Sequence, residues 1–178
     1  MAQPAKTNAM RLLERAGVPY EMHTYQAADG EIDGLSVAQK TGTPPEKVFK
    51  TLVTRGRSGG IYVFVLPVAR ELDMKLAAKA CGEKSVEMVH VKELLALTGY
   101  VRGGCSPAGM KKQYPTWLDQ AALQQETILV SGGKIGTQIE AAPPGPAAAT
   151  RASQRVLNAA GGRYYQYQAT GRKIEYRV

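Results

Sequence analysis

The chain has 178 residues, of which 44% are hydrophobic, and it carries a formal net charge of +8 at pH 7. This length is typical of one domain, and the hydrophobic content is enough for a core, which excludes a disordered or low-complexity protein. The longest strongly apolar run, residues 61–69, is far shorter than the ~18 residues of a membrane-spanning helix. The N-terminus lacks the apolar segment of a secretion signal. We therefore expect a cytoplasmic protein with no membrane association.

The sequence supplies few groups for metal or disulfide chemistry. Two cysteines, Cys81 and Cys105, are too few for a disulfide scaffold or a metal cluster, and a reducing compartment suits them. The two histidines, His23 and His90, lack the spacing of a zinc-enzyme helix, although either could act as a general base if the fold brought a nucleophile to it. We expect no metal and no cofactor.

The positive charge has two interpretations. Lysine and arginine are mostly exposed in any protein, so the excess can be ordinary solvated surface. An excess of this size also favours association with polyanions such as nucleic acids. Charge alone does not separate the two.

Turn residues divide the chain into short segments with helical or extended patterns. In the first half we expect a helix that begins after Thr7, a strand at 19–25 and a helix at 36–41. These are followed by one helical turn, opened by a capping box of Thr43 and Glu46, and by a hairpin of strands at 48–55 and 61–68. In the second half we expect a helix at 71–80 capped by Asp73, a helix at 91–99 and a short strand at 100–104. Two strands joined by a glycine-rich turn follow within 127–142, and then a helix at 153–159 and a C-terminal hairpin about 169–171.

These elements have no regular βαβ order. We therefore expect an α/β fold of the mixed α+β kind, in which a mixed, barrel-like β-sheet is surrounded by helices.

Three stretches carry residues that could do chemistry. In "RGGCSPAGMKK" (102–112), Cys105 or Ser106 could be a nucleophile, or the loop could be a bent backbone that holds another group in place. Lys50 lies inside the apolar "VFKTLV", where a lysine is costly unless it is paired, points into a cleft or lies at an edge that faces water. "SGGKIG" (131–136) is either a weak cradle for a phosphate or carboxylate or a plain hairpin turn.

Taken together, "VFKTLV", "GGCSPAGMKK" and "ILVSGGKIGTQIE" (128–140), in this order and spacing, resemble the YbaK/EbsC family of trans-editing domains. The opening "RLLERAGVPYEMHTY" matches as well, and the resemblance covers about residues 8–160. The family is related to the editing insertion of bacterial prolyl-tRNA synthetases. The resemblance implies a mixed barrel-like sheet surrounded by helices and hydrolysis of misacylated tRNA, with Cys-tRNA(Pro) as the best-known substrate. It implies the aminoacylated 3′ end of tRNA as a partner and makes prolyl-tRNA synthetase a candidate second one.

The resemblance also implies a role for each matching residue. Lys50 corresponds to the functional lysine that lies near the 3′-terminal adenosine and its phosphate. The loop Gly103, Gly104, Cys105, Ser106 and Pro107 corresponds to a loop whose backbone N–H groups hold the aminoacyl carbonyl. The residues that correspond to the substrate pocket are Tyr25, Thr51, Ser131, Gly132, Gly133 and Gln138. In the members of this family that act on Cys-tRNA, the substrate's own thiol attacks its ester carbon, so the resemblance implies that Cys105 and Ser106 are not nucleophiles.

Gln138 departs from the pattern of many family members, which carry an acidic residue at this position. A neutral amide cannot pair with an amino group as a carboxylate does, so alanine or another small aminoacyl group is an alternative to cysteine. Two further alternatives remain: a non-catalytic module that binds RNA ends or nucleotides, and a hydrolase of small esters that uses the Cys105 thiol.

We expect residues 1–160 to form the editing domain and 161–178 to form a separate C-terminal tail. The tail interleaves tyrosines with Arg163, Arg172, Lys173 and Arg177. That combination suits contact with RNA, and a solvated edge hairpin is the plainer interpretation.

Overall fold

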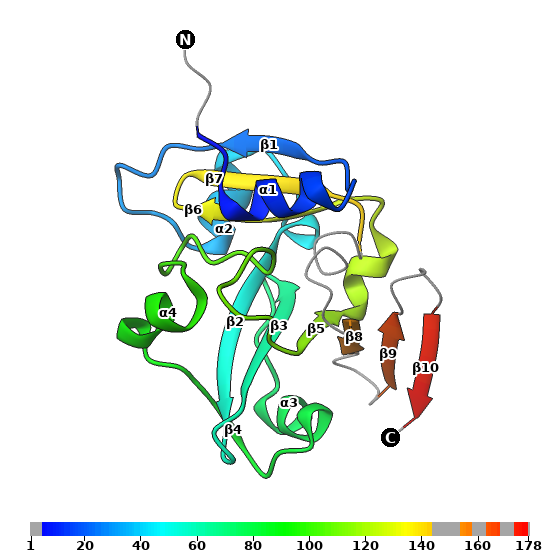
Figure 1. Cartoon of the computed structure of the whole chain (residues 1–178). Helices are drawn as coiled ribbons and strands as arrows, with labels where there is room; N and C mark the ends of the chain where they lie inside the picture. Colours follow the sequence, from blue (N-terminus) through cyan, green and yellow to red (C-terminus); the bar gives the residue numbers. More distant parts are fainter. Residues whose placement is uncertain (1–4, 144–153, 158–162, 168–172, 178) are drawn as a thin grey trace.

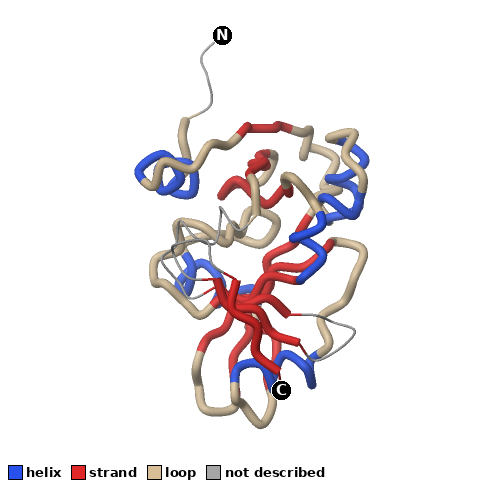
Figure 2. The backbone as a smooth tube through the Cα atoms, turned by 90° about the vertical axis from the view of Figure 1, so that its right-hand side faces the viewer, coloured by secondary structure: helices blue, strands red, loops and turns tan. Residues whose placement is uncertain are grey.

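The computed structural model describes residues 5–143, 154–157, 163–167 and 173–177. Its strands form two sheets, a small one of order β1-β7-β6 and a larger one of order β10-β9-β8-β5-β3-β2-β4. In Figure 1 the small sheet lies at the top beside α1, and the β2–β3 hairpin runs down from it. Figure 2 shows the same two sheets after a rotation of 90° about the vertical axis.

The helices are α1 (Asn8–Arg15), α2 (Gly34–Lys40), α3 (Met74–Cys81) and α4 (Val91–Thr98), with 3₁₀ turns η1 (Pro45–Lys47) and η2 (Gln120–Gln124). The strands are β1 (Glu21–Thr24), β2 (Phe49–Gly56), β3 (Ile61–Pro67), β4 (Val86–Met88), β5 (Thr116–Asp119), β6 (Ile128–Lys134), β7 (Thr137–Ala141), β8 (Gln154–Leu157), β9 (Arg163–Tyr167) and β10 (Lys173–Arg177). None of the helices in the described residues is long and apolar enough to cross a membrane.

The larger sheet is mixed. β2 pairs antiparallel with β3 and β4, whereas β5 pairs parallel with both β3 and β8. The C-terminal strands β9 and β10 pair antiparallel, as the expected tail hairpin requires, and β9 also pairs with β8. The two sheets meet at one parallel bridge, Val48 to Leu129. Within the described residues they therefore stay open and do not close into a barrel.

Local signals explain the helices that were expected. The Thr7 hydroxyl accepts a hydrogen bond from the Met10 N–H and so caps α1, as Asp73 caps α3 through the Lys75 and Leu76 N–H groups. Such caps satisfy backbone donors that the first helical turn leaves free. Both predicted cap residues are confirmed, although α3 begins at Met74 and not at residue 71.

The core has an aromatic centre. Trp117 on β5 is fully buried and stacks on Phe64 of β3, with ring centroids 5.4 Å apart, while Tyr62 meets its edge at 5.8 Å. Aromatic side chains bury large areas, so this cluster contributes strongly to holding β3 against β5. Neither β5 nor η2 is among the elements expected from the sequence.

Three local predictions are wrong. Thr43 and Glu46 form no capping box: η1 has no side-chain cap, and the Thr43 hydroxyl donates to the Thr41 carbonyl instead. Residues 100–104 are not a strand, because Gly104 N–H donates to the Val101 carbonyl at 3.0 Å and closes a turn.

The third error is the helix expected at 153–159, where Gln154–Leu157 form strand β8. The backbone of β8 pairs with β5 on one side and β9 on the other. Pairing with β5, which is distant in sequence, and with the following strand β9 therefore outweighs the local helical pattern.

Glu140 links three segments around the small sheet. Its carboxylate lies 2.9 Å from His23 Nε2 on β1 and 2.9 Å from Lys47 Nζ next to β2, and it accepts a hydrogen bond from Thr127. The hydrogen bonds from Thr127 and Lys47 are the main causes that lower the pKa of Glu140 to about 2. The ionised carboxylate thus helps to hold β1, β7 and η1 together.

We expect Glu140→Gln to destabilise the protein by about 2–3 kcal/mol at neutral pH, because a carboxyl group whose pKa is depressed on folding stabilises the fold while it is ionised. That contribution is complete above the ordinary glutamate pKa of 4.5 and is lost as pH falls towards about 2. Urea unfolding of both proteins between pH 7 and pH 2 should show the difference shrink. Glu87→Gln, at an exposed position on β4, is the control. Equal stability at pH 7 would contradict the role of Glu140.

Candidate functional site

A cavity of about 570 Å³ opens between the start of β2, the loop before α2, the loop 102–105 and the small sheet. It is lined by six residues that the sequence analysis singled out: Lys50, Thr51, Gly103, Cys105, Ser131 and Gln138. The bridge between Val48 and Leu129 brings β2 beside β6, and Ser131 pairs with Gln138 across β6 and β7. A volume of this size is typical of small-ligand sites.

Lys50 provides a cation in the cavity wall. It lies on β2 opposite Leu66 and is partly exposed. No carboxylate lies within ion-pair distance of its amino group among the residues that the structure describes. Of the positions that could explain a lysine in this apolar strand, the structure therefore has the one that faces a cleft. The positive charge of Lys50 is available to an anionic ligand there.

The loop after α4 is held against the glycine-rich turn between β6 and β7. A Cβ atom at Gly104 would lie 2.9 Å from Ile135 N and 2.9 Å from Lys134 Cα, which leaves no space for any side chain. Gly103 adopts a positive φ of 83°, a conformation that costs other residues energy. Glycine is thus needed at both positions to bring the loop over the cavity.

The backbone N–H groups of this loop divide into two kinds. The Gly104 N–H is already bonded to the Val101 carbonyl, so the role expected for it as a carbonyl-binding donor is not supported. The N–H groups of Gly103 and Cys105 have no acceptor in the described part of the chain, and both residues line the cavity. They are the donors that an oxygen atom in the cavity could use.

The two side chains that could be nucleophiles are poorly placed for that role. Cys105 is 8% exposed, and burial raises the pKa of its thiol to about 11. Ser106 is fully buried, and its hydroxyl accepts a hydrogen bond from the Ala108 N–H. A thiol with so high a pKa is almost wholly protonated at neutral pH, which disfavours nucleophilic attack.

Two predicted pocket residues carry buried hydroxyl groups without a hydrogen-bond partner in the described residues: Tyr25 and Thr51. Unpaired buried polar atoms are uncommon and are often found where a ligand supplies the partner. Thr51 lines the cavity, whereas Tyr25 is not among its lining residues.

The remaining predicted residues do not line the cavity. Gly132 and Gly133 form a bulge between Ser131 and Lys134, and the Gly133 N–H donates to the Ser131 hydroxyl at 3.2 Å. Gly104, Ser106 and Pro107 do not line the cavity, and Pro107 lines a second cavity on the other side of the loop.

Several lining residues were not predicted from the sequence, among them Ile32, Asp33 and Arg102. Asp33 caps α2, and the hydrogen bonds that it accepts from the Ser36 hydroxyl and N–H lower its pKa. An aspartate just before an apolar helical pattern is a recognised cap signal that could have located this helix start. Its low pKa makes it a weak base.

One group of side chains with metal-ligand atoms occurs in the described residues. Potential ligand atoms of Glu21, His23 and Glu140 lie within 4.8 Å of one another. The Glu140 carboxylate is already bonded to Thr127 and Lys47 as well as to His23, and Glu21 is exposed. We interpret Glu140 with His23 and Lys47 as an ion-paired joint at the small sheet.

Comparison with known proteins identifies the family. A sequence model described as "Aminoacyl-tRNA editing domain" matches residues 35–144, more than half of the chain. The chain belongs to the aminoacyl-tRNA editing domain family. The resemblance to trans-editing domains that the three motifs indicated is therefore confirmed.

A curated relative and two solved structures agree with this assignment. A protein of Enterococcus faecalis named "Putative Cys-tRNA(Pro)/Cys-tRNA(Cys) deacylase EbsC" is 51% identical over 138 residues, 78% of this chain and 84% of that protein. A structure described as "Crystal structure of a putative trans-editing enzyme for prolyl tRNA synthetase" is 25% identical, with a TM-score of 0.74 over 87% of this chain and 98% of that one. The hypothetical protein APE2540 has a TM-score of 0.74 at 22% identity, over 83% and 97% of the two chains, and supports the fold alone.

The buried Cys105 thiol should react slowly with alkylating agents. In a Cys81→Ser variant, iodoacetamide should modify Cys105 about 100-fold more slowly at neutral pH than an exposed thiol, because a pKa two units above the ordinary value of 9.0 lowers the thiolate fraction by that factor. Mass spectrometry over a pH series should show the rate still rising towards pH 11. Modification at the rate of an exposed thiol at pH 7 would show that Cys105 is activated.

Proposed function

We propose that this protein is a trans-acting aminoacyl-tRNA deacylase that hydrolyses mischarged tRNA(Pro), with Cys-tRNA(Pro) as its main substrate. The observation that carries the proposal is that Lys50, Gly103 and Cys105 line one cavity, while the N–H groups of Gly103 and Cys105 have no acceptor among the described residues. The 51% identical relative named as a Cys-tRNA(Pro)/Cys-tRNA(Cys) deacylase supports the choice of substrate.

Each group around the cavity suits a part of an aminoacylated 3′ end. The Lys50 ammonium suits the phosphate of the terminal adenosine, since a compact cation binds phosphate oxygens well. The Gly103 and Cys105 N–H groups suit the ester carbonyl oxygen. The Thr51 hydroxyl, buried and without a partner in the described residues, and the Ser131 hydroxyl suit the polar groups of the ribose or the amino acid.

The titratable side chains that line the cavity in the described residues include no histidine and no glutamate. They are Asp33, Lys50, Arg102 and Cys105; the pKa of Asp33 is lowered and that of Cys105 is raised. A site of this composition can orient a substrate and stabilise charge on its carbonyl oxygen. It therefore favours a reaction in which the substrate supplies its own nucleophile.

A cysteinyl ester contains such a nucleophile. The substrate thiol attacks the ester carbon, so that a carbon–sulfur bond forms, the carbon–oxygen bond to the ribose breaks, and the thiol proton passes to the departing ribose oxygen. Water then opens the resulting thiolactone to give free cysteine. The protein contributes orientation of the thiol and the two N–H donors.

We also propose the setting in which this reaction takes place. A deacylase of this kind acts where tRNA is charged, in the cytoplasm, and prolyl-tRNA synthetase is the candidate partner because it produces the mischarged tRNA. A synthetase pocket discriminates weakly between amino acids of similar size, which is why a second hydrolytic site is useful. We further propose that residues 1–160 form the catalytic unit and 161–178 its C-terminal tail.

Loss of Lys50 should abolish activity while the fold is retained. We expect Lys50→Ala to reduce kcat/KM for Cys-tRNA(Pro) by about 100-fold or more, the range seen when a charge-stabilising group is removed. Lys50→Arg should retain part of the activity, because its charge can still reach a phosphate. Lys92→Ala, at an exposed position on α4, is the matched control. Unchanged turnover by Lys50→Ala, at unchanged Tm, would contradict the proposed role.

The substrate thiol can be tested without changing the protein. Ala-tRNA(Pro) differs from Cys-tRNA(Pro) by that thiol, so we expect release of cysteine to be much faster than release of alanine, and Pro-tRNA(Pro) to be spared. Cysteine and alanine released at equal rates would indicate attack by water. Release of alanine alone would still indicate a deacylase. It would show that a site lined by Gln138 prefers an amino acid other than cysteine. No release from any charged tRNA would favour a binding module.

A further inference from the structure

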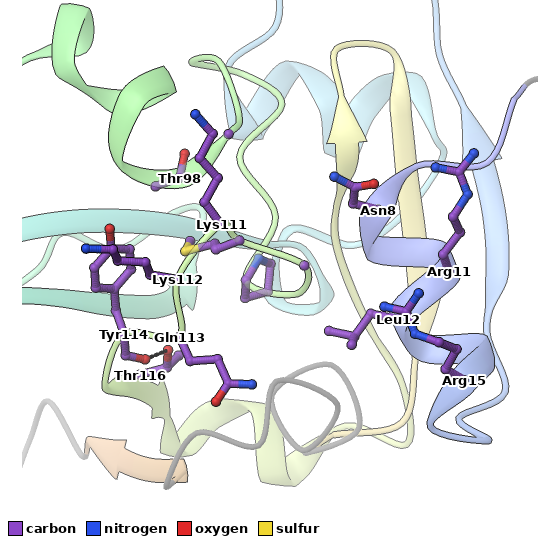
Figure 3. Close-up of a pocket in the computed structure, with 14 residues that line it drawn as sticks. Asn8, Arg11, Leu12, Arg15, Thr98, Lys111, Lys112, Gln113, Tyr114 and Thr116 are labelled. Carbon is purple, nitrogen blue, oxygen red and sulfur yellow. Dashed lines mark hydrogen bonds between the residues drawn. The ribbon is translucent and has the colours of Figure 1, made fainter.

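A second cavity, of about 390 Å³, lies on the other side of the loop that covers the candidate site. Its walls come from α1 and from the end of that loop, and four of its lining side chains are cations: Arg11, Arg15, Lys111 and Lys112. Figure 3 shows the two arginines on α1 at one side and the two lysines on the loop at the other. None of its lining residues is acidic. We call this the basic cavity.

The arginines share one face of α1. Asn8, Arg11, Leu12 and Arg15 line the basic cavity and recur at intervals of three and four residues, which places them on one helical stripe. The nearest acidic residue on the helix is Glu14, and it is paired with Lys6 at 2.8 Å. The stripe therefore presents two cations whose charge no ion pair in the described part of the chain offsets.

The opposite wall is fixed relative to α1. A Cβ atom at Gly109 would lie 2.8 Å from Ala9 N and 2.9 Å from Asn8 C, so the loop packs directly on the helix backbone. The Tyr100 hydroxyl donates to the Ala108 carbonyl at 2.7 Å, and the Lys111 N–H donates to the Thr98 carbonyl at 3.0 Å. These contacts fix the backbone of the loop, which carries the two lysines, relative to the backbone of α1, which carries the two arginines.

The composition of the basic cavity fits a phosphate backbone. Four exposed cations on two facing walls suit several phosphates in a row, and such contacts need no base sequence. Single-stranded nucleic acid is usually held by aromatic side chains that stack on bases. Here the one aromatic lining residue is Tyr114, whose hydroxyl is bonded to the Leu97 carbonyl at 2.7 Å.

The two cavities are neighbours along the loop. Cys105 lines the candidate site and Pro107 lines the basic cavity, and residues two apart in sequence lie within about 7 Å of each other. We propose that the basic cavity binds the phosphates of the RNA duplex that adjoins a 3′ end held in the candidate site, the acceptor stem. The inference rests on the proposed function for the identity of the RNA.

A labelled RNA hairpin tests this directly. The probe is an uncharged acceptor-stem minihelix ending in CCA, and its binding is followed by fluorescence anisotropy between about 50 and 200 mM salt. We expect the double variant Arg11→Gln/Arg15→Gln to bind about tenfold more weakly and to lower the slope of log K against log salt by about two, since each lost phosphate contact lowers it by about one. Lys111→Gln/Lys112→Gln should act in the same direction from the other wall.

The matched control uses a second pair of lysines. Lys75 and Lys79 are exposed, four residues apart on α3, and α3 lies at the opposite end of the molecule from α1 in Figure 1. Lys75→Gln/Lys79→Gln removes the same charge and should leave binding and salt slope unchanged. Wild-type binding by the Arg11/Arg15 variant at unchanged Tm, or an equal loss in the control, would overturn the proposal.

A further pair of probes separates this inference from the proposed deacylase activity. A short single strand ending in CCA should bind the wild type and the Arg11/Arg15 variant alike; an equal loss with this strand would show that the cavity does not select duplex. Cysteinyl ester on the single strand should be cleaved equally by both proteins, whereas KM for full-length Cys-tRNA(Pro) should rise in the variant. If the wild type cleaves neither ester, the proposed function fails, and the minihelix result still decides whether the basic cavity binds duplex RNA.

Discussion

The contact between Gly104 and the backbone of Lys134 and Ile135 is the constraint on which both cavities depend. It fixes the loop after α4 to the glycine-rich turn of the small sheet at a distance that excludes any side chain. On one side of the contact, Gly103 and Cys105 of the loop line the candidate site. On the other side the loop continues to Gly109, which packs on the backbone of α1. Hence the residue that positions the loop is not itself a ligand-binding group.

Local sequence signals predicted a substantial part of this arrangement. The caps Thr7 and Asp73, and the β2–β3 hairpin, follow from residue types within one or two turns of the chain, and the structure has them where they were expected. The site residues Lys50 and Ser131 came from motif resemblance, and the structure brings both to one cavity. Short-range patterns identify an element, and a motif identifies which elements belong to one site.

Long-range pairing and exact backbone geometry were not predictable in this way. Gln154–Leu157 become a strand because the backbones of β5 and β9 flank them, and nothing within the segment itself indicates those neighbours. The turn closed by the Gly104 N–H removes one expected donor, which a motif of glycines cannot reveal. The Glu140 joint combines residues from β1, η1 and β7 that are separated by up to 117 positions. Contacts of this kind depend on the assembled fold.

The division of charge between the two cavities separates two tasks that a tRNA-specific enzyme has to perform. The candidate site is lined by Lys50, Gly103, Cys105 and polar side chains, which in the proposed reaction distinguish the chemistry of one aminoacyl group. The basic cavity contains cations alone as charged groups, which contribute affinity without reading sequence. Because one loop forms a wall of each, RNA held in the basic cavity would place its end within reach of the candidate site. Overall affinity for tRNA and selectivity for the amino acid can then change independently, through different side chains of the same loop and its neighbours.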